Sequence, residues 1–186
     1  MIHLRDIAIG LFFLWLCIDS IFMRRYMTAA ADNRDRFSLK VIVIGGPLTW
    51  LLSIGLSFGA IGAIHSAVLQ GMGLAIMAFG IALRFTAIAQ LGRFHSPNVA
   101  IQADHRLIET GLYRFVRHPS YLGALIAFLG FSLALGNWLS VLTMMAIIPW
   151  LYLYRIREED AVLLAAFGDE YRDYCRRTKR LIPGLY

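Results

Sequence analysis

Long apolar runs limit what this chain can fold into more than any other feature of its sequence. Five runs stand out, each bounded by charged or turn-forming residues: 7–23, 41–63, 67–91, 121–135 and 138–154. A helix that crosses a bilayer needs about 20 predominantly apolar residues, and a shorter one can span where the bilayer thins. Charged residues make up only 16% of the chain, against about a quarter in a typical soluble domain. The pattern predicts an all-α, polytopic membrane protein with five transmembrane helices.

The runs fill the chain so completely that we expect a single integral membrane domain over residues 1–186. Residues 1–91 would hold three N-terminal spans, and residues 92–186 a polar cytosolic loop, a helical hairpin and a C-terminal tail. The last two runs should form the hairpin, because Gly136-Asn137 between them is typical of tight turns. The first run lacks a small-residue cleavage site, so we interpret it as a retained helix and not as a signal peptide.

Basic residues predict how the spans are oriented. They gather after the first span, after the third span and in the tail, whereas the connections after the second and fourth spans contain no Lys or Arg. Because Lys and Arg collect in cytoplasmic segments, five spans place the N-terminus outside and the C-terminus in the cytoplasm. The net charge of +6 is then explained by contacts with anionic membrane lipid, and nucleic acid is not an expected partner. Because no targeting extension precedes the first span, we expect a prokaryotic inner membrane.

Small and charged residues inside the predicted spans have packing as their simplest explanation. The glycines concerned are Gly55, Gly59, Gly71, Gly73 and Gly80. Close helix packing in lipid is favoured over a nucleotide-binding loop or a dimer seam, because no strand precedes these glycines. Arg84, within the third span, should face a cavity or extend toward the membrane surface. Asp19, near the end of the first span, is a candidate structural partner for an arginine. Whether either residue lines a substrate cavity stays open.

A dense polar cluster, residues 111–123, leads into the fourth span with the sequence GLYRFVRHPSYLG. Proline disfavours helix at the preceding residue and is favoured in the first turn of a helix. The loop should therefore end at His118, and the helix should begin at Pro119. His118 and Arg117 would then lie at a helix N-terminus, where free N–H groups attract anions.

A second polar cluster, residues 155–160, lies where the fifth span leaves the membrane. Carboxylates so near the bilayer are costly unless they are paired or solvated. Arg155 and Glu159 are four residues apart, so they share one helix face and can offer a ligand one positive and one negative group. Because the hairpin brings both clusters to the same membrane surface, we interpret them as one active site. From Glu158 onwards, apolar residues recur at helical spacing, which predicts a cytosolic helix that Gly168 can interrupt.

Metal and nucleophilic chemistry are not indicated. His95, His105 and His118 lack the short helical spacing of a zinc site, so we expect no metal. No Ser-His-Asp order is evident. Cys17 and Cys175 lie apart, one in an apolar run and one in the charged tail, and they form neither a disulfide framework nor a nucleophilic setting.

Five stretches follow one another in a recognisable order. They are His105-Arg-Leu-Ile108, Gly111-Leu-Tyr113, Arg117-His118-Pro119-Ser120-Tyr121-Leu-Gly123, and Arg155-x-x-x-Glu159 followed by FGDEYRDY over 167–174. Together they resemble the two motifs of the isoprenylcysteine carboxyl methyltransferase family. The resemblance covers residues 91–181, about half of the chain.

The resemblance implies a membrane methyltransferase that binds S-adenosylmethionine between the cytosolic loop and the last two spans. It implies cofactor contacts, position by position, for Gln102, His105, Leu107, Ile108, Tyr113, His118, Pro119, Ser120, Tyr121 and Glu159. Arg155 would face the substrate carboxylate, so Arg155 and Glu159 are the expected catalytic residues. The acceptor implied is lipid-like, first of all the carboxylate of an isoprenylated cysteine. The first two spans carry no recognisable motif, and the oligomeric state stays open.

Other functions remain to be separated from this one. Similar motifs occur in membrane methyltransferases that act on phospholipid amines or small thiols, although an amine acceptor would need a base that the sequence does not identify. Sterol reductases have a related C-terminal architecture but bind a nicotinamide cofactor and are larger. A non-enzymatic scaffold or a transporter is a third class, and the lack of an internal repeat argues against a transporter. Binding of S-adenosylmethionine, of NADPH or of neither would distinguish the three classes.

Overall fold

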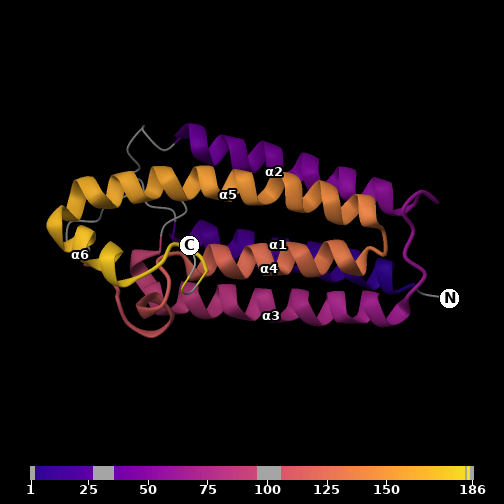
Figure 1. Ribbon diagram of the computed structural model, residues 1–186, viewed down its shortest axis with the longest axis horizontal. Helices are drawn as coiled ribbons and strands as arrows, with labels where there is room; N and C mark the ends of the chain where they lie inside the picture. The colour runs from indigo at the N-terminus through magenta and orange to yellow at the C-terminus, as the bar shows by residue number, and fades with distance from the viewer. Residues whose placement is uncertain (1–2, 27–35, 96–105, 183, 185–186) are drawn as a thin grey trace.

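The computed structural model describes residues 3–26, 36–95, 106–182 and 184. Within these ranges the chain forms six α-helices, two 3-10 helices and two isolated β-bridges. The α-helices are α1 (Leu4–Tyr26), α2 (Arg36–Ser57), α3 (Ala67–Leu91), α4 (Pro119–Ala134), α5 (Trp138–Phe167) and α6 (Asp169–Arg177); the 3-10 helices are η2 (Gly92–Phe94) and η3 (Gly111–Arg114). Helices α1 to α5 lie side by side along the long axis, and α6 lies at the end where α5 finishes (Figure 1).

Each of the five apolar runs forms a helix, as predicted, but the second helix is shorter than expected. α2 ends at Ser57, so the prediction that the second span continues to residue 63 is wrong. Residues 58–62 form turns instead, and Gly62 takes a φ of 78°, a value that favours glycine. Helices α1, α2, α3 and α5 are long and apolar enough to cross a membrane, whereas α4 has 16 residues.

The outer surface of the bundle is apolar. Leu48 of α2, Phe79 of α3 and Leu142 of α5 are 63–64% exposed, and further large apolar side chains lie exposed along the same helices. Monomeric soluble proteins rarely expose large contiguous apolar patches, so this surface is suited to lipid. The fold is therefore all-helical, with an exterior suited to a bilayer.

Glycines allow α3 and α4 to approach each other closely. A Cβ atom added to Gly80 would lie 2.6 Å from the carbonyl oxygen of Gly123 and 2.8 Å from Cα of Ala127. A Cβ atom added to Gly73 would lie 2.7 Å from the carbonyl oxygen of Gly130. Backbone therefore touches backbone along this interface, which gains dispersion energy that lipid cannot replace. The predicted packing role is confirmed for Gly73 and Gly80.

The other helix pairs are joined by side chains. Ser140 of α5 donates its hydroxyl to the carbonyl of Ser53 on α2 at 2.6 Å. Phe12 of α1 stacks on Phe131 of α4, with the ring centroids 3.9 Å apart. Because Gly71 meets no atom within 4 Å of an added Cβ, the predicted packing role does not extend to this glycine.

The turn between α4 and α5 is built on Gly136, whose φ is 70°, and on the fully buried Asn137. The side-chain oxygen of Asn137 accepts hydrogen bonds from the first N–H groups of α5, which caps the helix. Its amide nitrogen donates to the carbonyls of Leu56 and Ile61 at 3.1 and 2.9 Å. One side chain therefore joins the α4–α5 turn to the α2–α3 turn.

Replacing Asn137 with Ala should lower the free energy of unfolding by about 2 kcal/mol, because a helix cap is lost and two backbone carbonyls lose their donor. The measurement is the thermal unfolding midpoint in detergent. Asn137→Ser is the matched control: its hydroxyl oxygen can still cap the helix but the amide donor is lost, so its midpoint should lie between those of the wild type and Asn137→Ala. An unchanged midpoint in Asn137→Ala would contradict this role.

An ion pair lies inside the bundle, between α1 and α3. Nε and one terminal nitrogen of Arg84 donate to the two carboxylate oxygens of Asp19 at 2.7 and 2.9 Å. The other terminal nitrogen of Arg84 lies 3.4 Å from the carbonyl of Ser120, at the start of α4. The predicted structural pairing of Asp19 is confirmed. Arg84 does not extend toward the surface, because its guanidinium is already neutralised within the protein.

The C-terminal region differs in one respect from the sequence-based expectation. No separate helix starts at Glu158, because α5 continues without a break to Phe167. The interruption at Gly168 is confirmed, since Gly168 takes a φ of 54° and ends α5. α6 then carries Asp169 in its first turn and Arg177 in its last, both favourable to the helix dipole.

Candidate active site

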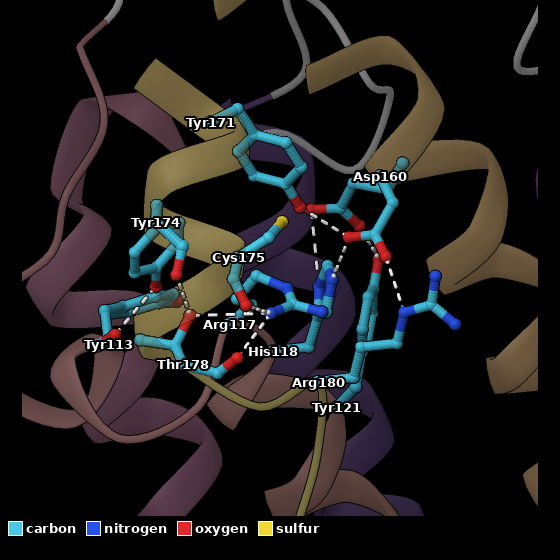
Figure 2. A network of polar contacts seen from close by, with 11 residues as sticks. Tyr113, Arg117, His118, Tyr121, Asp160, Tyr171, Tyr174, Cys175, Thr178 and Arg180 are labelled. Carbon is cyan, nitrogen blue, oxygen red and sulfur yellow. Dashed lines mark hydrogen bonds and ion pairs between the residues drawn. The ribbon is translucent and has the colours of Figure 1, made fainter. Parts of the chain in front are cut away.

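The two polar clusters meet at the end of the bundle where α4 begins. His118 is the N-cap residue of α4 and Pro119 lies in the first turn, as predicted. The C-terminal segment holds this start in place: the N–H groups of Arg117 and His118 donate to the carbonyls of Lys179 and Arg180 at 2.8 and 3.0 Å. Segments 62 residues apart in the chain are therefore brought side by side (Figure 2).

Three residues that the sequence predicted as cofactor contacts come together here. The hydroxyl of Tyr121 donates to Oε2 of Glu159 at 2.7 Å. Nδ1 of His118 lies 4.0 Å from Oε1 of the same carboxylate. The rings of His118 and Tyr121 stack with centroids 5.6 Å apart. The side chain of Glu159 is 27% exposed and that of His118 only 4%, so Glu159 is the group that an incoming ligand can reach.

Arg155 lies one helical turn before Glu159 on α5 and is 2% exposed. It is within electrostatic reach of Glu158 and Glu159. Because the guanidinium is buried in the bundle, it can bind only an acceptor group that enters between the helices. The side chain therefore lies inside the protein and not on an outer face, and its predicted contact with a substrate carboxylate stays a prediction.

Tyr113 and Ser120, two further predicted cofactor contacts, are both buried. The hydroxyl of Tyr113 donates to the carbonyl of Ala87 on α3 at 3.3 Å, and its own carbonyl accepts from the hydroxyl of Tyr174 at 2.7 Å. Burial raises the pKa of Tyr113, so its hydroxyl keeps its proton. Ser120 is 7% exposed.

The remaining predicted cofactor residues precede η3 in the sequence. Leu107 and Ile108 are half-buried in the stretch that leads into η3. Gln102 and His105 lie outside the described residues. In the part of the chain that the structure describes, no three His, Cys, Asp or Glu side chains are grouped to hold a metal ion.

Asp160 has a role that the sequence did not reveal. Nε2 of His118 lies 2.8 Å from Oδ1 of Asp160, and the hydroxyl of Tyr171 donates to the same oxygen. Nε of Arg180 donates to Oδ2 at 2.8 Å. Burial and the charge of Asp160 both raise the pKa of Tyr171, so the phenol remains a donor. Figure 2 shows α4, α5, α6 and the tail converging on this carboxylate.

Arg117 lies elsewhere than its sequence neighbourhood suggested. The expectation placed its side chain with His118 at the N-terminus of α4. Instead, one terminal nitrogen of Arg117 donates to the carbonyls of Cys175 and Thr178 at 3.2 and 2.6 Å, at the C-terminal end of α6. The last carbonyls of a helix lack intrahelical donors and carry partial negative charge, so they hold this cation at the end of α6, where its charge still reaches Asp160 and Tyr171.

The fold and the cluster define a class of protein: a helical integral membrane protein with a polar site at one end of the bundle and a buried arginine beside it. The chain matches the family model of isoprenylcysteine carboxyl methyltransferase over residues 73–165, half of its length. The chain belongs to this family, and it is accordingly a methyltransferase that requires a methyl donor.

Named relatives agree with this assignment. The protein-S-isoprenylcysteine O-methyltransferase of Schizosaccharomyces pombe is 33% identical over 95% of this chain and 84% of the relative. The protein-S-isoprenylcysteine O-methyltransferase B of Arabidopsis thaliana is 32% identical over 62% of this chain and 59% of the relative. A solved structure of the eukaryotic intramembrane Ras methyltransferase superposes with a TM-score of 0.67 and 28% identity, covering 76% of this chain and 53% of that one. The chain spans about half of the solved protein, which shares its membrane fold.

Proposed function

We propose that this chain transfers a methyl group from S-adenosylmethionine to the carboxylate of an isoprenylated cysteine. Family membership supports the reaction class. The observation that carries the proposal is the placement of Glu159, with Tyr121 and His118, one helical turn from the buried Arg155. A site for a cationic donor therefore adjoins a site for an anionic acceptor.

The charge and the aromatic rings of the cluster suit the cofactor. S-adenosylmethionine carries a sulfonium and an ammonium group, both positive. The partly exposed carboxylate of Glu159 offers a counter-charge. Tyr152 packs edge-on against Tyr121 with centroids 5.4 Å apart, so two aromatic rings lie near this carboxylate, and such rings favour cations. When bound, the cofactor supplies an electrophilic methyl group.

Arg155 orients the acceptor carboxylate. A guanidinium can hold a carboxylate through two parallel hydrogen bonds, which aligns one oxygen for an in-line displacement. A carboxylate is already a nucleophile, so the chain need not provide a general base. Positioning of two reactants can supply a large part of the barrier reduction in such a reaction. Burial of Arg155 also excludes water from the acceptor.

The membrane arrangement follows from the placement of charge. We propose five spans, α1 to α5, with the N-terminus outside and the basic segments, the cofactor loop and α6 on the cytoplasmic side of a prokaryotic inner membrane. The whole chain then forms one domain, with residues 92–186 holding the cofactor. A prenyl chain would enter laterally from the bilayer, and the cofactor from the cytosol.

The test is a calorimetric titration of the detergent-purified protein with S-adenosylhomocysteine, with NADPH as the control. Methyl transfer to N-acetyl-S-farnesylcysteine follows, with the corresponding C-terminal amide as a substrate that lacks the carboxylate. Saturable binding of S-adenosylhomocysteine and methylation of the acid alone support the proposal. Methylation of a phospholipid amine or a small thiol in place of the acid would reassign the acceptor, and binding of neither cofactor, repeated in nanodiscs, would contradict the proposal.

Glu159→Gln should weaken S-adenosylhomocysteine and S-adenosylmethionine binding, and the latter more, because only S-adenosylmethionine carries the sulfonium charge. The loss for S-adenosylmethionine should be about tenfold, the size expected for a hydrogen-bonded charge. Competition titration of the two ligands measures the difference. Glu158→Gln is the matched control on the same helix and should leave both affinities unchanged; equal losses in the two variants would contradict the role of Glu159.

Arg155→Ala should lower kcat/KM for the prenylated cysteine by about ten- to hundredfold, because a charged hydrogen-bonding partner of the acceptor is lost. Cofactor affinity should survive. Arg157→Ala on the exposed side of α5 is the control and should retain activity. If Arg155→Ala loses cofactor affinity as well, the arginine has a structural role instead.

A further inference from the structure

Asp160 is the point at which three elements meet. Its Oδ1 atom is shared by His118 at the start of α4 and Tyr171 on α6, and its Oδ2 atom accepts from Arg180 in the tail. The Asp160 side chain is only 12% exposed. A carboxylate that accepts from a phenol and from a guanidinium remains ionised and can only accept hydrogen bonds.

This fixes where the proton of His118 lies. Since Asp160 only accepts, Nε2 of His118 must be the donor in their 2.8 Å hydrogen bond. The ring therefore turns Nδ1 toward Glu159, 4.0 Å away, on the side where Tyr121 stacks. In the singly protonated ring, Nδ1 is then a hydrogen-bond acceptor directed into the proposed cofactor site.

Tail docking does not depend on Asp160 alone. The backbone N–H groups of Arg117 and His118 pair with the carbonyls of Lys179 and Arg180, and the side chain of Arg117 binds the carbonyl of Thr178 at 2.6 Å. These contacts hold the C-terminal segment against the start of α4. Because these contacts already attach the tail, the hydrogen bond between Asp160 and His118 is not needed for attachment. Its further effect is to orient the imidazole ring.

We propose that Asp160 is a positioning residue that holds His118 in its Nε2-protonated form, so that Nδ1 accepts a hydrogen bond from the cofactor. The inference rests on the proposed function, because it assigns the ligand side of His118. It predicts that replacing Asp160 changes the tautomer of the His118 ring while the protein stays folded. The carboxylate thus acts on the cofactor through the histidine and does not itself touch it.

The decisive measurement is ¹⁵N NMR of the His118 ring in the protein reconstituted in nanodiscs, assigned with a His118→Gln sample. Chemical shifts distinguish protonated from unprotonated ring nitrogens. In the wild-type protein we expect a proton on Nε2 and none on Nδ1. A proton on Nδ1, alone or together with one on Nε2, would overturn the proposal without any variant being needed.

Variants then separate positioning from attachment. Asp160→Ala should give a mixture of ring tautomers and weaken S-adenosylhomocysteine binding by about tenfold, the loss expected for one charge-assisted contact. The double variant Tyr171→Phe with Arg180→Met removes the other two side-chain donors and keeps the acceptor for His118. It should retain the wild-type tautomer and an affinity within about threefold of the wild type.

Each outcome supports or overturns the positioning role of Asp160. Equal losses of affinity in both variants would make Asp160 an attachment point only and would overturn the proposal. If Asp160→Ala does not fold, the wild-type spectrum and the double variant still test whether Asp160 sets the tautomer of His118. If the wild-type protein binds no S-adenosylhomocysteine, the proposed function fails, whereas the wild-type spectrum still tests whether Asp160 sets the tautomer.

Discussion

Replacing Asp19 with Ala is expected to lower the free energy of unfolding by about 3–5 kcal/mol, because Arg84 would be left charged and without its carboxylate inside the helix bundle. The two hydrogen bonds of this pair measure 2.7 and 2.9 Å, and Arg84 is 7% exposed. Thermal unfolding in detergent measures the loss. For a domain of this size, about 2–4 °C corresponds to each kcal/mol.

A double replacement tests whether the loss comes from the orphaned charge. Asp19→Leu combined with Arg84→Met removes both charges and retains apolar volume, and it should restore most of the stability. The exposed pair Arg176–Asp173 on α6 offers a matched control, since exposed pairs contribute little; Asp173→Ala should shift the midpoint hardly at all. A small effect of Asp19→Ala would mean that Arg84 finds another partner.

Gly80→Val is expected to destabilise the protein by about 3 kcal/mol or more, because the added atoms meet backbone and not a flexible side chain. An added Cβ would lie 2.6 Å from the carbonyl oxygen of Gly123 and 2.8 Å from Cα of Ala127. Helix α4 would have to move away from α3, and His118 at the start of α4 would move with it. Both the unfolding midpoint and S-adenosylhomocysteine affinity should fall.

Gly71→Val is the matched control, on the same helix and nine residues away. An added Cβ there meets nothing within 4 Å, so stability and binding should stay near the wild type. The comparison cancels any effect of valine on helix formation itself. If the two variants are equally stable, close approach of α3 and α4 is not what holds the bundle together.

Much of the fold follows from local sequence. Apolar runs predict the five long helices, Pro119 predicts the start of α4, and Gly168 predicts the interruption before α6. The physical reason is that both residues act locally: proline fixes its own φ and disfavours helix at the residue before it, whereas glycine can take the positive φ that ends a helix. The end of α2 was harder to predict, because residues 58–63 remain apolar although the chain turns there.

The candidate site was only partly predictable. A spacing of four residues places Arg155 and Glu159 on one turn of α5, and the family resemblance pointed to His118 and Tyr121. The resemblance also implied Gln102 and His105, which lie outside the described residues, so these two remain predictions. Nothing in the sequence indicated that Asp160, rather than Glu159, forms the short contact with His118.

The sequence by itself determined the class of protein, the positions of the helices and the motifs of the family, because hydrophobic length, turn chemistry and residue spacing act along the chain. Tertiary structure alone decided which charges meet. Asp19 and Arg84 are 65 residues apart, and His118 and Asp160 are 42 apart. Such pairs form only when helix packing removes water from both partners, since a buried charge is stable only beside its partner, and packing depends on the whole bundle.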